Sequence, residues 1–206
     1  MTAQDKQTEE KIFDAATDVF EEKGLAGARM QDISDRAGIN KSLLHYYFRT
    51  KEKLFNAVFE MVARKMFSRF APVFEENMSL EDKIRFFFRE HISFLQKNPR
   101  LPAFVINEIN QNPERVKKLV ENIDYKGILE KMLEKHKHEI DKYDINEKTI
   151  PQIMTSIAAL SVFPFAAKGL IETLLKGAGY DFNTYMEERK EFAAEFVIRG
   201  ITKKSD

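Results

Sequence analysis

The sequence has no cysteine, and this absence removes several kinds of chemistry at once. Without a thiol, the chain cannot form disulfides, bind zinc through thiolates or use a cysteine nucleophile. The absence also fits a reducing compartment, and we expect a cytoplasmic protein. At 206 residues the chain is still long enough to bury a hydrophobic core without covalent cross-links.

An uninterrupted hydrophobic run is also lacking. Residues 1–10 are polar and acidic, so no secretory signal is expected. The most apolar stretch, 153–175, is broken by polar, proline and glycine residues such as Pro164 and Lys168, whereas a membrane span needs about 20 predominantly apolar residues. We therefore predict a buried helix at this position and no membrane partner.

Motifs that carry catalytic chemistry do not stand out either. We find no glycine-rich phosphate loop, nucleophile elbow, His-x-x-x-His helix or paired-carboxylate pattern in the sequence. His136 and His138 lie in a charged run with Glu134 and Glu139, where metal binding is conceivable but a solvated helix face is favoured. We therefore expect a protein that is not an enzyme and that uses no cofactor or metal.

The chain has no net charge, because 33 basic side chains balance 33 acidic ones. The charges are unevenly distributed, however. Residues 1–22 hold two basic and seven acidic side chains, whereas residues 23–53 hold seven basic and three acidic ones. A local basic excess is what a compact DNA-facing surface needs, although small clusters of this kind are usually solvated faces.

Helical spacing is present along nearly the whole chain, with no convincing strand. A first helix with a Thr8 cap should end at Gly24, and the helix that starts near residue 50 should stop before Pro72. Pro164 should kink its helix. The pattern predicts an all-α chain with a natural division near residue 50, and further helices near 30–37, 41–48, 80–97, 101–110, 114–138, 149–176 and 182–202.

The segment 30–48 carries the main functional signal. Ala37 lets two short helices approach closely, Gly38 can take the left-handed conformation that ends the first helix, and Asn40 can cap the second. This pattern predicts a helix-turn-helix. Its apolar residues can close one small core with the preceding helix: Ile12, Ala16, Phe20, Ile33, Ala37, Ile39, Leu44 and Phe48.

The front of the second short helix should then face outward. Lys41, Ser42, His45 and Tyr46 lie there, and all four can donate hydrogen bonds, as the residues that reach base edges in the major groove must. Lys51 lies in the first turn of the next helix, where a cation opposes the helix dipole, and this placement makes sense if a phosphate docks there. An ordinary helical hairpin could share the turn, but the whole register favours DNA binding.

This register resembles the TetR family of bacterial transcriptional regulators over about residues 9–58. The chain departs from the family at Ala28-Arg29, where a small hydroxyl residue usually stands, and at Leu43 and His45. The resemblance implies a three-helix DNA-binding domain at 1–50 and a larger helical domain at 51–206 that binds an effector and dimerises. The matching segments are Phe20–Gly24, Asp32–Ile33, Ala37–Ile39, Tyr46–Phe48 and Lys51–Phe55.

The resemblance also implies roles for single residues on double-stranded DNA. Base reading falls on Lys41, Ser42 and His45. Because one module contacts too few base pairs for useful specificity, we expect a two-fold dimer on a near-palindromic operator. Phosphate binding falls on Arg29, Gln31, Tyr46, Tyr47 and Lys51.

The function expected from this pattern is that of a ligand-responsive transcriptional regulator, a repressor that a small effector releases from its operator. The helix from about 51 to 71 joins both halves of the chain and can move as a rigid lever, so that a ligand fitting only one arrangement shifts the population towards it. The alternative is a helical interaction or small-molecule-binding protein with only non-specific DNA binding.

The second half of the chain offers an aromatic interior, since fifteen of the 18 phenylalanines follow residue 50. An apolar or aromatic effector is conceivable, although core packing explains any single phenylalanine. His91 lies on the apolar stripe of helix 80–97 and is either a satisfied core residue or a polar contact in a ligand pocket. The candidate ligand-binding residues are Phe88, His91, Phe104, Asn107 and Glu108.

The last two predicted helices offer a dimer surface. Aromatic residues and an arginine recur there at helical spacing, and the family resemblance implies a four-helix bundle built from two copies. Burial inside one subunit is the alternative. The candidate interface residues are Phe163, Tyr185, Arg189, Phe192 and Phe196.

Overall fold

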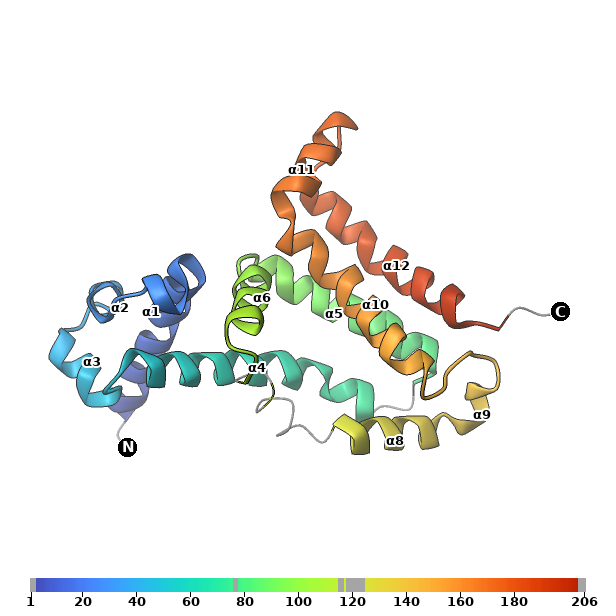
Figure 1. The fold of residues 1–206 in the computed structure, drawn as a ribbon, viewed down its shortest axis with the longest axis horizontal. Coiled ribbons are helices and arrows are strands. Elements are labelled where there is room, and N and C mark those ends of the chain that lie inside the picture. The colour runs from blue at the N-terminus through green and yellow to red at the C-terminus, as the bar shows by residue number, and fades with distance from the viewer. Residues whose placement is uncertain (1–2, 76–77, 115–116, 118–124, 204–206) are drawn as a thin grey trace. The chain divides into compact units, whose positions relative to one another are not determined.

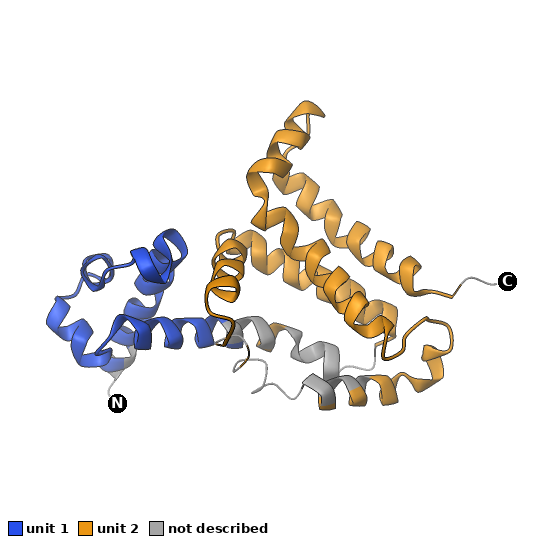
Figure 2. Cartoon of the chain, viewed as in Figure 1, with its two compact units in different colours: residues 1–67 blue, residues 68–206 orange. Residues whose placement is uncertain are grey.

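The computed structural model describes residues 3–75, 78–114, 117 and 125–203, and every regular element in this part is a helix. The all-α class predicted from the periodicity is confirmed. The chain forms two compact units, residues 1–67 and 68–206 (Figure 2). This division lies later than residue 50, because the first half of the helix that follows residue 50 packs into unit 1.

Unit 1 contains α1 (Ala3–Gly27), α2 (Met30–Ala37), α3 (Lys41–Tyr47) and the first part of α4 (Lys51–Glu75) (Figure 1). Its core is largely the predicted one, although Ala37, Ile39 and Phe48 are only partly buried. Two residues of α4 complete it: Leu54 is buried, and the Phe55 ring meets that of Phe20 edge-on at 4.9 Å. The fully buried predicted residues are Ile12, Ala16, Phe20, Ile33 and Leu44.

Backbone geometry explains the turn between α2 and α3. Gly38 takes the left-handed conformation (φ 66°, ψ 32°), and its N–H donates to the carbonyls of the last turn of α2. Asn40 then caps α3, because its Oδ1 accepts from the N–H of Leu43 at 2.7 Å. At the start of α2, Arg29 makes no capping hydrogen bond, as expected from the missing hydroxyl residue.

Unit 2 holds a long central helix, α5, which packs against α10 and α12, while α10 also packs against α6. Arg85 of α5 ties this arrangement together, since its guanidinium lies 2.7 Å from the carboxylate of Glu195 on α12 and 3.2 Å from that of Glu81. Part of the predicted helix 114–138 falls outside the described residues. The helices of this unit are α5 (Leu80–Lys97), α6 (Leu101–Gln111), α8 (Tyr125–Lys135), α9 (Lys137–Ile140), α10 (Thr149–Ala166), α11 (Lys168–Gly177) and α12 (Phe182–Ile201).

Two predicted helix boundaries are wrong. α4 continues to Glu75, past Pro72, because a proline lacks one N–H donor but its fixed φ is compatible with a helix. The predicted helix 149–176 is two helices, α10 and α11, separated at Ala167. Pro164 cannot donate to the carbonyl of Leu160, and the Nε of Arg189 donates to that oxygen instead, at 2.9 Å.

The expectation that the apolar stretch 153–175 forms a buried helix is also wrong. By length and composition α10 is the one helix among the described residues that could cross a membrane, but its burial in unit 2 is limited to Ser161, Pro164 and Phe165. α10 packs on α5, α6 and α12 with part of its surface only. Apolar side chains on the rest of α10 therefore remain accessible.

The turn at Gly38 provides a test of the helix-turn-helix geometry. A Cβ at this position would meet nothing within 4 Å, so replacement by alanine adds only the cost of a left-handed backbone. We expect Gly38→Ala to lower the free energy of unfolding by about 1–2 kcal/mol, measured by urea denaturation. Gly38→Asn is the matched control and should cost less, because asparagine visits this conformation more readily. Equal stability of the alanine variant and the parent would contradict the left-handed conformation of Gly38.

Candidate nucleic-acid interface and ligand pocket

The front of α3 faces solvent, as the sequence predicted. Lys41, Ser42, His45 and Tyr46 are all exposed, and the Tyr46 side chain is 81% accessible. Leu44 lies on the opposite side of α3 and is fully buried. This arrangement presents an ammonium, two hydroxyls and an imidazole outward at the beginning of a short helix, which is the part of a recognition helix that reaches bases.

The two tyrosines at the end of α3 have different environments. Their rings meet edge-on at 5.6 Å, but Tyr47 is half-buried and its hydroxyl donates to the Asp5 carboxylate of α1 at 3.2 Å. Burial and the neighbouring Asp5 raise the pKa of Tyr47, so the phenol stays protonated at neutral pH. Tyr46 is therefore the more accessible of the two predicted phosphate contacts.

Arg29 and Gln31 lie at the beginning of α2 and are both exposed. The Gln31 amide donates to the Asp35 carboxylate one turn later, at 2.7 Å. Two other basic residues of this region are paired within unit 1: Lys23 with Asp32 and Arg36 with Glu22. The hydrogen bond from Lys23 lowers the pKa of Asp32.

Lys51 has a structural partner that the sequence reasoning missed. Its ammonium donates to the carbonyl of Ala28 at 2.9 Å and lies 3.4 Å from that of Ala26. These carbonyls follow the break at Gly24, where α1 leaves helical geometry (φ 65°, ψ 177°). Lys51 therefore joins the start of α4 to the end of α1, and its proposed contact with phosphate stays a prediction.

A pocket of about 380 Å³ lies in unit 2, between α5 and α10. Side chains from α8, from the segment before α10 and from the end of α12 complete its lining. The volume lies within the range of small-molecule sites. Six isoleucines supply much of the wall: Ile84, Ile145, Ile150, Ile153, Ile157 and Ile201.

His91 is one of two polar side chains in this lining, together with Lys83. Its Nδ1 lies 3.0 Å from the Oγ of Ser161, which itself donates to the carbonyl of Ile157 at 2.9 Å. The Nδ1–H group of His91 is therefore the donor towards Ser161. Burial lowers the pKa of His91 to about 4, so the imidazole is neutral at pH 7.

The other candidate ligand residues do not line this pocket. Phe88 and Phe104 are buried in the core, and Asn107 is exposed, accepting from Gln111 at 3.0 Å. Glu108 is buried and accepts from Asn112 at 2.9 Å. Of the five residues predicted for ligand binding, the structure brings only His91 to the pocket. The sequence signal that could have found the wall is the isoleucine spacing along α10.

The histidine pair near α9 is not the uniformly solvated face that was favoured. His138 is exposed, but His136 is buried, with its Nδ1 3.1 Å from the Glu139 carboxylate. The Glu139 carboxylate accepts a hydrogen bond from the backbone N–H of Leu80 and another from the His136 side chain. Both bonds lower the pKa of the Glu139 carboxyl group. In the part of the chain that the structure describes, no three potential ligands form a metal-binding group.

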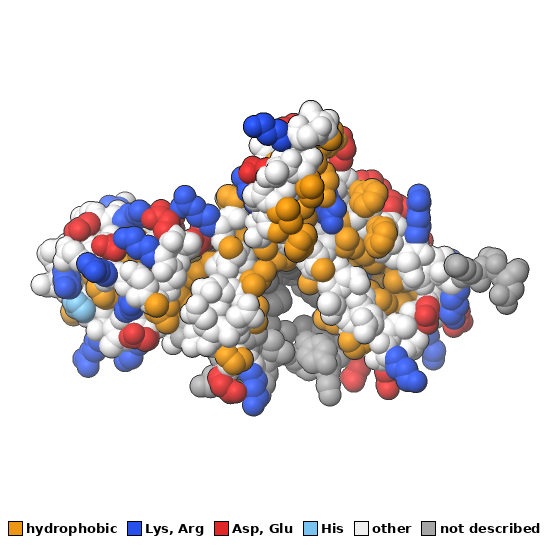
Figure 3. Space-filling model, turned by 45° about the horizontal axis from the view of Figure 1, so that its top comes forward, with side chains coloured by type: hydrophobic (Ala, Val, Ile, Leu, Met, Phe, Trp, Pro, Cys, Tyr) orange, Lys and Arg blue, Asp and Glu red, His pale blue; other side chains and the backbone are white. Residues whose placement is uncertain are grey.

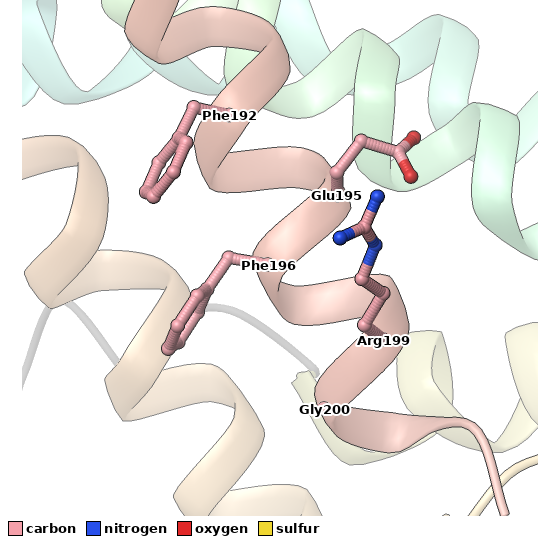
Figure 4. Close-up of a pocket in the computed structure, with 5 residues that line it drawn as sticks. All are labelled: Phe192, Glu195, Phe196, Arg199 and Gly200. Atoms are coloured by element: carbon pink, nitrogen blue, oxygen red, sulfur yellow. The ribbon is translucent and has the colours of Figure 1, made fainter.

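An aromatic surface lies on α10 and α12. Phe163 is exposed, and Phe192 and Phe196 are 62% and 59% accessible, with their rings stacked at 6.3 Å. Figure 4 shows both rings projecting from the same side of α12, with the Glu195 and Arg199 side chains on the other side of the helix in this view. The space-filling view in Figure 3 shows hydrophobic side chains gathered on unit 2.

The remaining interface candidates support the fold of their own chain. Tyr185 and Arg189 are half-buried. An Nη of Arg189 donates to the Tyr185 hydroxyl at 2.9 Å, and its Nε donates to the carbonyl of Leu160. The sequence reasoning missed Leu170 and Leu174 of α11, which are also exposed. We name the surface formed by Phe163, Leu170, Leu174, Phe192 and Phe196 the apolar face.

The geometry of unit 1 defines a helix-turn-helix DNA-binding domain: a capped α3 with an exposed front follows a left-handed glycine turn, packs on α2 and is hydrogen-bonded to α1 through Tyr47. Residues 12–58 match the family model described as bacterial regulatory proteins, tetR family. This match identifies residues 12–58, less than a quarter of the chain, as a domain similar to the DNA-binding domain of that family.

Similar sequences include regulators from several bacteria. Over 56 residues the chain is 41% identical to the transcriptional repressor NicS of Pseudomonas putida. This aligned segment covers 27% of this chain and 26% of NicS. A fatty acid metabolism regulator protein of Bacillus subtilis is 23% identical over 125 residues, or 60% of this chain and 64% of that protein. The chain thus spans about a quarter of the first relative's length and less than two thirds of the second's.

Solved structures extend the likeness to the whole fold. A TetR-family transcriptional regulator from Haemophilus influenzae superposes with a TM-score of 0.67 at 17% identity, over 98% of this chain and 100% of that one. The fatty acid degradation regulator FadR of Bacillus halodurans gives a TM-score of 0.64 at 18% identity, over 90% and 93%. Helical unit 2 therefore has the architecture found in these regulators.

The burial of His91 predicts a pH-dependent stability. Because the pKa of about 4 lies below the ordinary 6.5, the unfolded chain binds a proton at this site before the folded chain does. His91 therefore contributes its full stability above about pH 6.5 and loses it as the pH falls towards 4, by up to about 1.4 kcal/mol per pH unit. The check is urea unfolding of the parent and His91→Gln between pH 7.5 and 4.5.

The glutamine variant should show a flatter pH profile than the parent over this range. His138→Gln is the matched control, since His138 is exposed, and it should follow the parent. Parallel profiles for the parent and His91→Gln would show that His91 is not buried in its neutral form.

Proposed function

We propose that this chain is a cytoplasmic transcriptional regulator, a repressor that binds a near-palindromic operator as a homodimer and is released by a small apolar effector. The observation that carries the proposal is the exposed row of donors on α3, held outward by the burial of Leu44. Base reading is assigned to Lys41, Ser42 and His45.

Phosphate binding is assigned to the residues around this row: Arg29, Gln31, Tyr46, Tyr47 and Lys51. The exposure of Arg29, Gln31 and Tyr46 supports their assignment. Lys51 would contact a phosphate while keeping its bond to Ala28, since an ammonium has three donors. Tyr47 has one O–H donor, so it would exchange the Asp5 carboxylate for a phosphate oxygen.

The apolar face supports dimerisation. Large aromatic side chains exposed as a group usually mark an interaction site. A two-fold axis would place the face against its own copy, with Arg199 close to Phe196. Two linked modules would then read half-sites about 34 Å apart, one turn of DNA.

Coupling between effector and DNA is assigned to α4. This helix begins in unit 1, where Leu54 and Phe55 are buried, and continues into unit 2, where Arg69 lies over the Phe94 ring of α5 at 5.3 Å. α5 also supplies part of the pocket wall. A ligand that favours one position of α5 would shift α4, with a coupling of about 1–3 kcal/mol, or roughly 5–150-fold in DNA affinity.

Selection of bound sequences from a random DNA pool is the experiment that tests the DNA-binding function directly. Enrichment of one near-palindromic sequence supports a regulator. Footprinting upstream of the coding region provides the second readout: selective protection supports the proposal, whereas salt-sensitive smearing favours an interaction protein with only non-specific DNA binding.

Two lysine variants separate base reading from phosphate binding. Lys41→Ala should cost about 1–3 kcal/mol on the selected sequence and little on random DNA, because a base contact is lost. Lys51→Ala should weaken binding to all sequences and lower the slope of log affinity against log salt by about one. Fluorescence anisotropy titrations at several salt concentrations measure both effects.

Lys11→Ala is the control for these variants, because Lys11 is an exposed lysine elsewhere in unit 1 and should leave affinity nearly unchanged. Circular dichroism should accompany Lys51→Ala, since this variant also removes the link to α1. An unchanged salt slope in a folded Lys51→Ala protein would remove the phosphate role.

If the apolar face forms the dimer interface, a charged substitution in it should halve the molar mass of the protein in solution. Phe196→Glu places a charge in the centre of the apolar face and should convert a dimer to a monomer in multi-angle light scattering, since burying an unpaired carboxylate is costly. Ile109→Glu, at an exposed position on α6, is the control and should remain dimeric. A parent protein that is monomeric at micromolar concentration would refute the dimer.

A further inference from the structure

The lining of the unit 2 pocket narrows the class of ligand it can take. Apart from Phe87, Lys83 and His91, every lining side chain is aliphatic. Flat aromatic ligands are usually held between aromatic rings, which offer stacking or edge-on contacts. With one phenylalanine in the wall, this pocket offers little of that geometry and mostly hydrocarbon contact.

The wall is arranged as two stripes along neighbouring helices. α10 contributes Ile150, Ile153 and Ile157, at the spacing of one helix face, and α5 contributes Phe87 and other residues in the same periodicity. From Ile150 to Ile157 the α10 stripe extends for roughly 10 Å at the rise of an α-helix. α5 and α10 pack against each other, and both stripes line the same pocket.

Two of the lining residues come from segments that the backbone holds together. The N–H of Asp144 donates to the carbonyl of Ile201 at 2.7 Å, and Tyr143 and Thr202 form an isolated bridge. These bonds place Ile145 beside the end of α12, where Ile201 also faces the pocket. This part of the lining is therefore apolar and held by main-chain hydrogen bonds.

The stiffness of the wall favours a preformed site. Isoleucine has one strongly preferred χ1 rotamer in a helix, so Ile150, Ile153 and Ile157 keep their shape without a ligand. Met154, which is about half exposed, is the adaptable member of the lining. A charge would be costly against this hydrocarbon wall, and His91 is itself neutral at pH 7.

We propose that this pocket binds one unbranched aliphatic chain of about a dozen carbons, as in an alkanol or a fatty acyl compound, with its polar head outside the isoleucine wall. The length follows from the volume: 380 Å³ holds roughly a dozen groups of about 30 Å³, the share of one water molecule in the liquid. The proposal rests on the proposed function, because it names the class of the effector.

Binding of two homologous series of ligands tests the proposed preference for an aliphatic chain. Saturated 1-alkanols and alkanoates of increasing length are titrated into the full-length protein below their critical micelle concentrations, by calorimetry or by displacement of a fluorescent alkyl probe. Affinity should rise about fourfold for each added methylene and stop rising near twelve carbons. A bicyclic aromatic alcohol of similar volume should bind more weakly than the matching alkanol.

Comparing the two series shows whether the head group of the ligand, a hydroxyl or a carboxylate, affects binding. Equal affinities of alkanol and alkanoate place the head in solvent, and tighter alkanoate binding places the carboxylate near Lys83. Equal affinities that rise with chain length support the proposal, whereas tighter alkanoate binding overturns the position of the head group outside the wall. An affinity that is independent of length in both series, or an aromatic alcohol that binds as tightly as the best alkanol, overturns it.

Variants that change the groove length give an independent readout. Ala158→Leu narrows the pocket from an exposed position and should move the plateau to chains shorter by about three carbons, the size of the addition. Ile157→Ala enlarges the pocket and should move the plateau in the opposite direction. Ala103→Leu, at an exposed site on α6 outside the lining, is the matched control and should change nothing.

DNA binding by the same preparations distinguishes the two proposals. Selective DNA binding without length-dependent chain binding would refute the ligand class and leave the regulator intact. Length-dependent chain binding without selective DNA binding would refute the regulator and leave a chain-binding protein. If the Ala158→Leu and Ile157→Ala plateaus coincide with that of the parent, the chain occupies another surface and the proposal fails.

Discussion

The burial of Leu44 against the core of unit 1 is the interaction on which the DNA-binding surface depends. α3 is only two turns long, so it has little stability of its own and takes its orientation from what it buries. With Leu44 inside, Ser42 and Tyr46 face the opposite way, because each lies two positions from it on the same helix, and Lys41 and His45 are exposed beside them. The Gly38 turn and the Asn40 cap then set where this helix begins.

A comparable constraint organises unit 2 around Pro164. Because the proline cannot donate, the carbonyl of Leu160 needs another partner, and Arg189 of α12 provides it. This bond attaches α10 to α12 while leaving much of α10 unburied. The same helix can therefore contribute isoleucines to a pocket and Phe163 to the apolar face.

The two constraints also explain why residues with one chemical character have different tasks. Tyr46 and Tyr47 are neighbours on α3, yet one is exposed and the other donates to Asp5. Phe192 and Phe196 are exposed on α12, whereas the nearby Ala193 and Val197 are buried within the chain. Helical periodicity separates such neighbours, and packing decides which side becomes the surface.

Much of the N-terminal domain could be predicted from sequence, because its signals are local. A glycine at a left-handed position, an asparagine cap and a short apolar stripe act within a few residues, and they were recognised at Gly38, Asn40 and Leu44. The partners of Lys51 were missed, since the carbonyls of Ala26 and Ala28 are more than twenty positions away and nothing local indicates them.

Sequence alone thus determined the helical class, the helix-turn-helix and the outward donors of α3. Tertiary structure decided which apolar residues line a pocket, which form the apolar face and which fill the core. Isoleucine and phenylalanine carry no local mark that distinguishes these three fates. The choice depends on contacts between helices far apart in the chain, such as α5 with α10, and these arise only when the whole unit has folded.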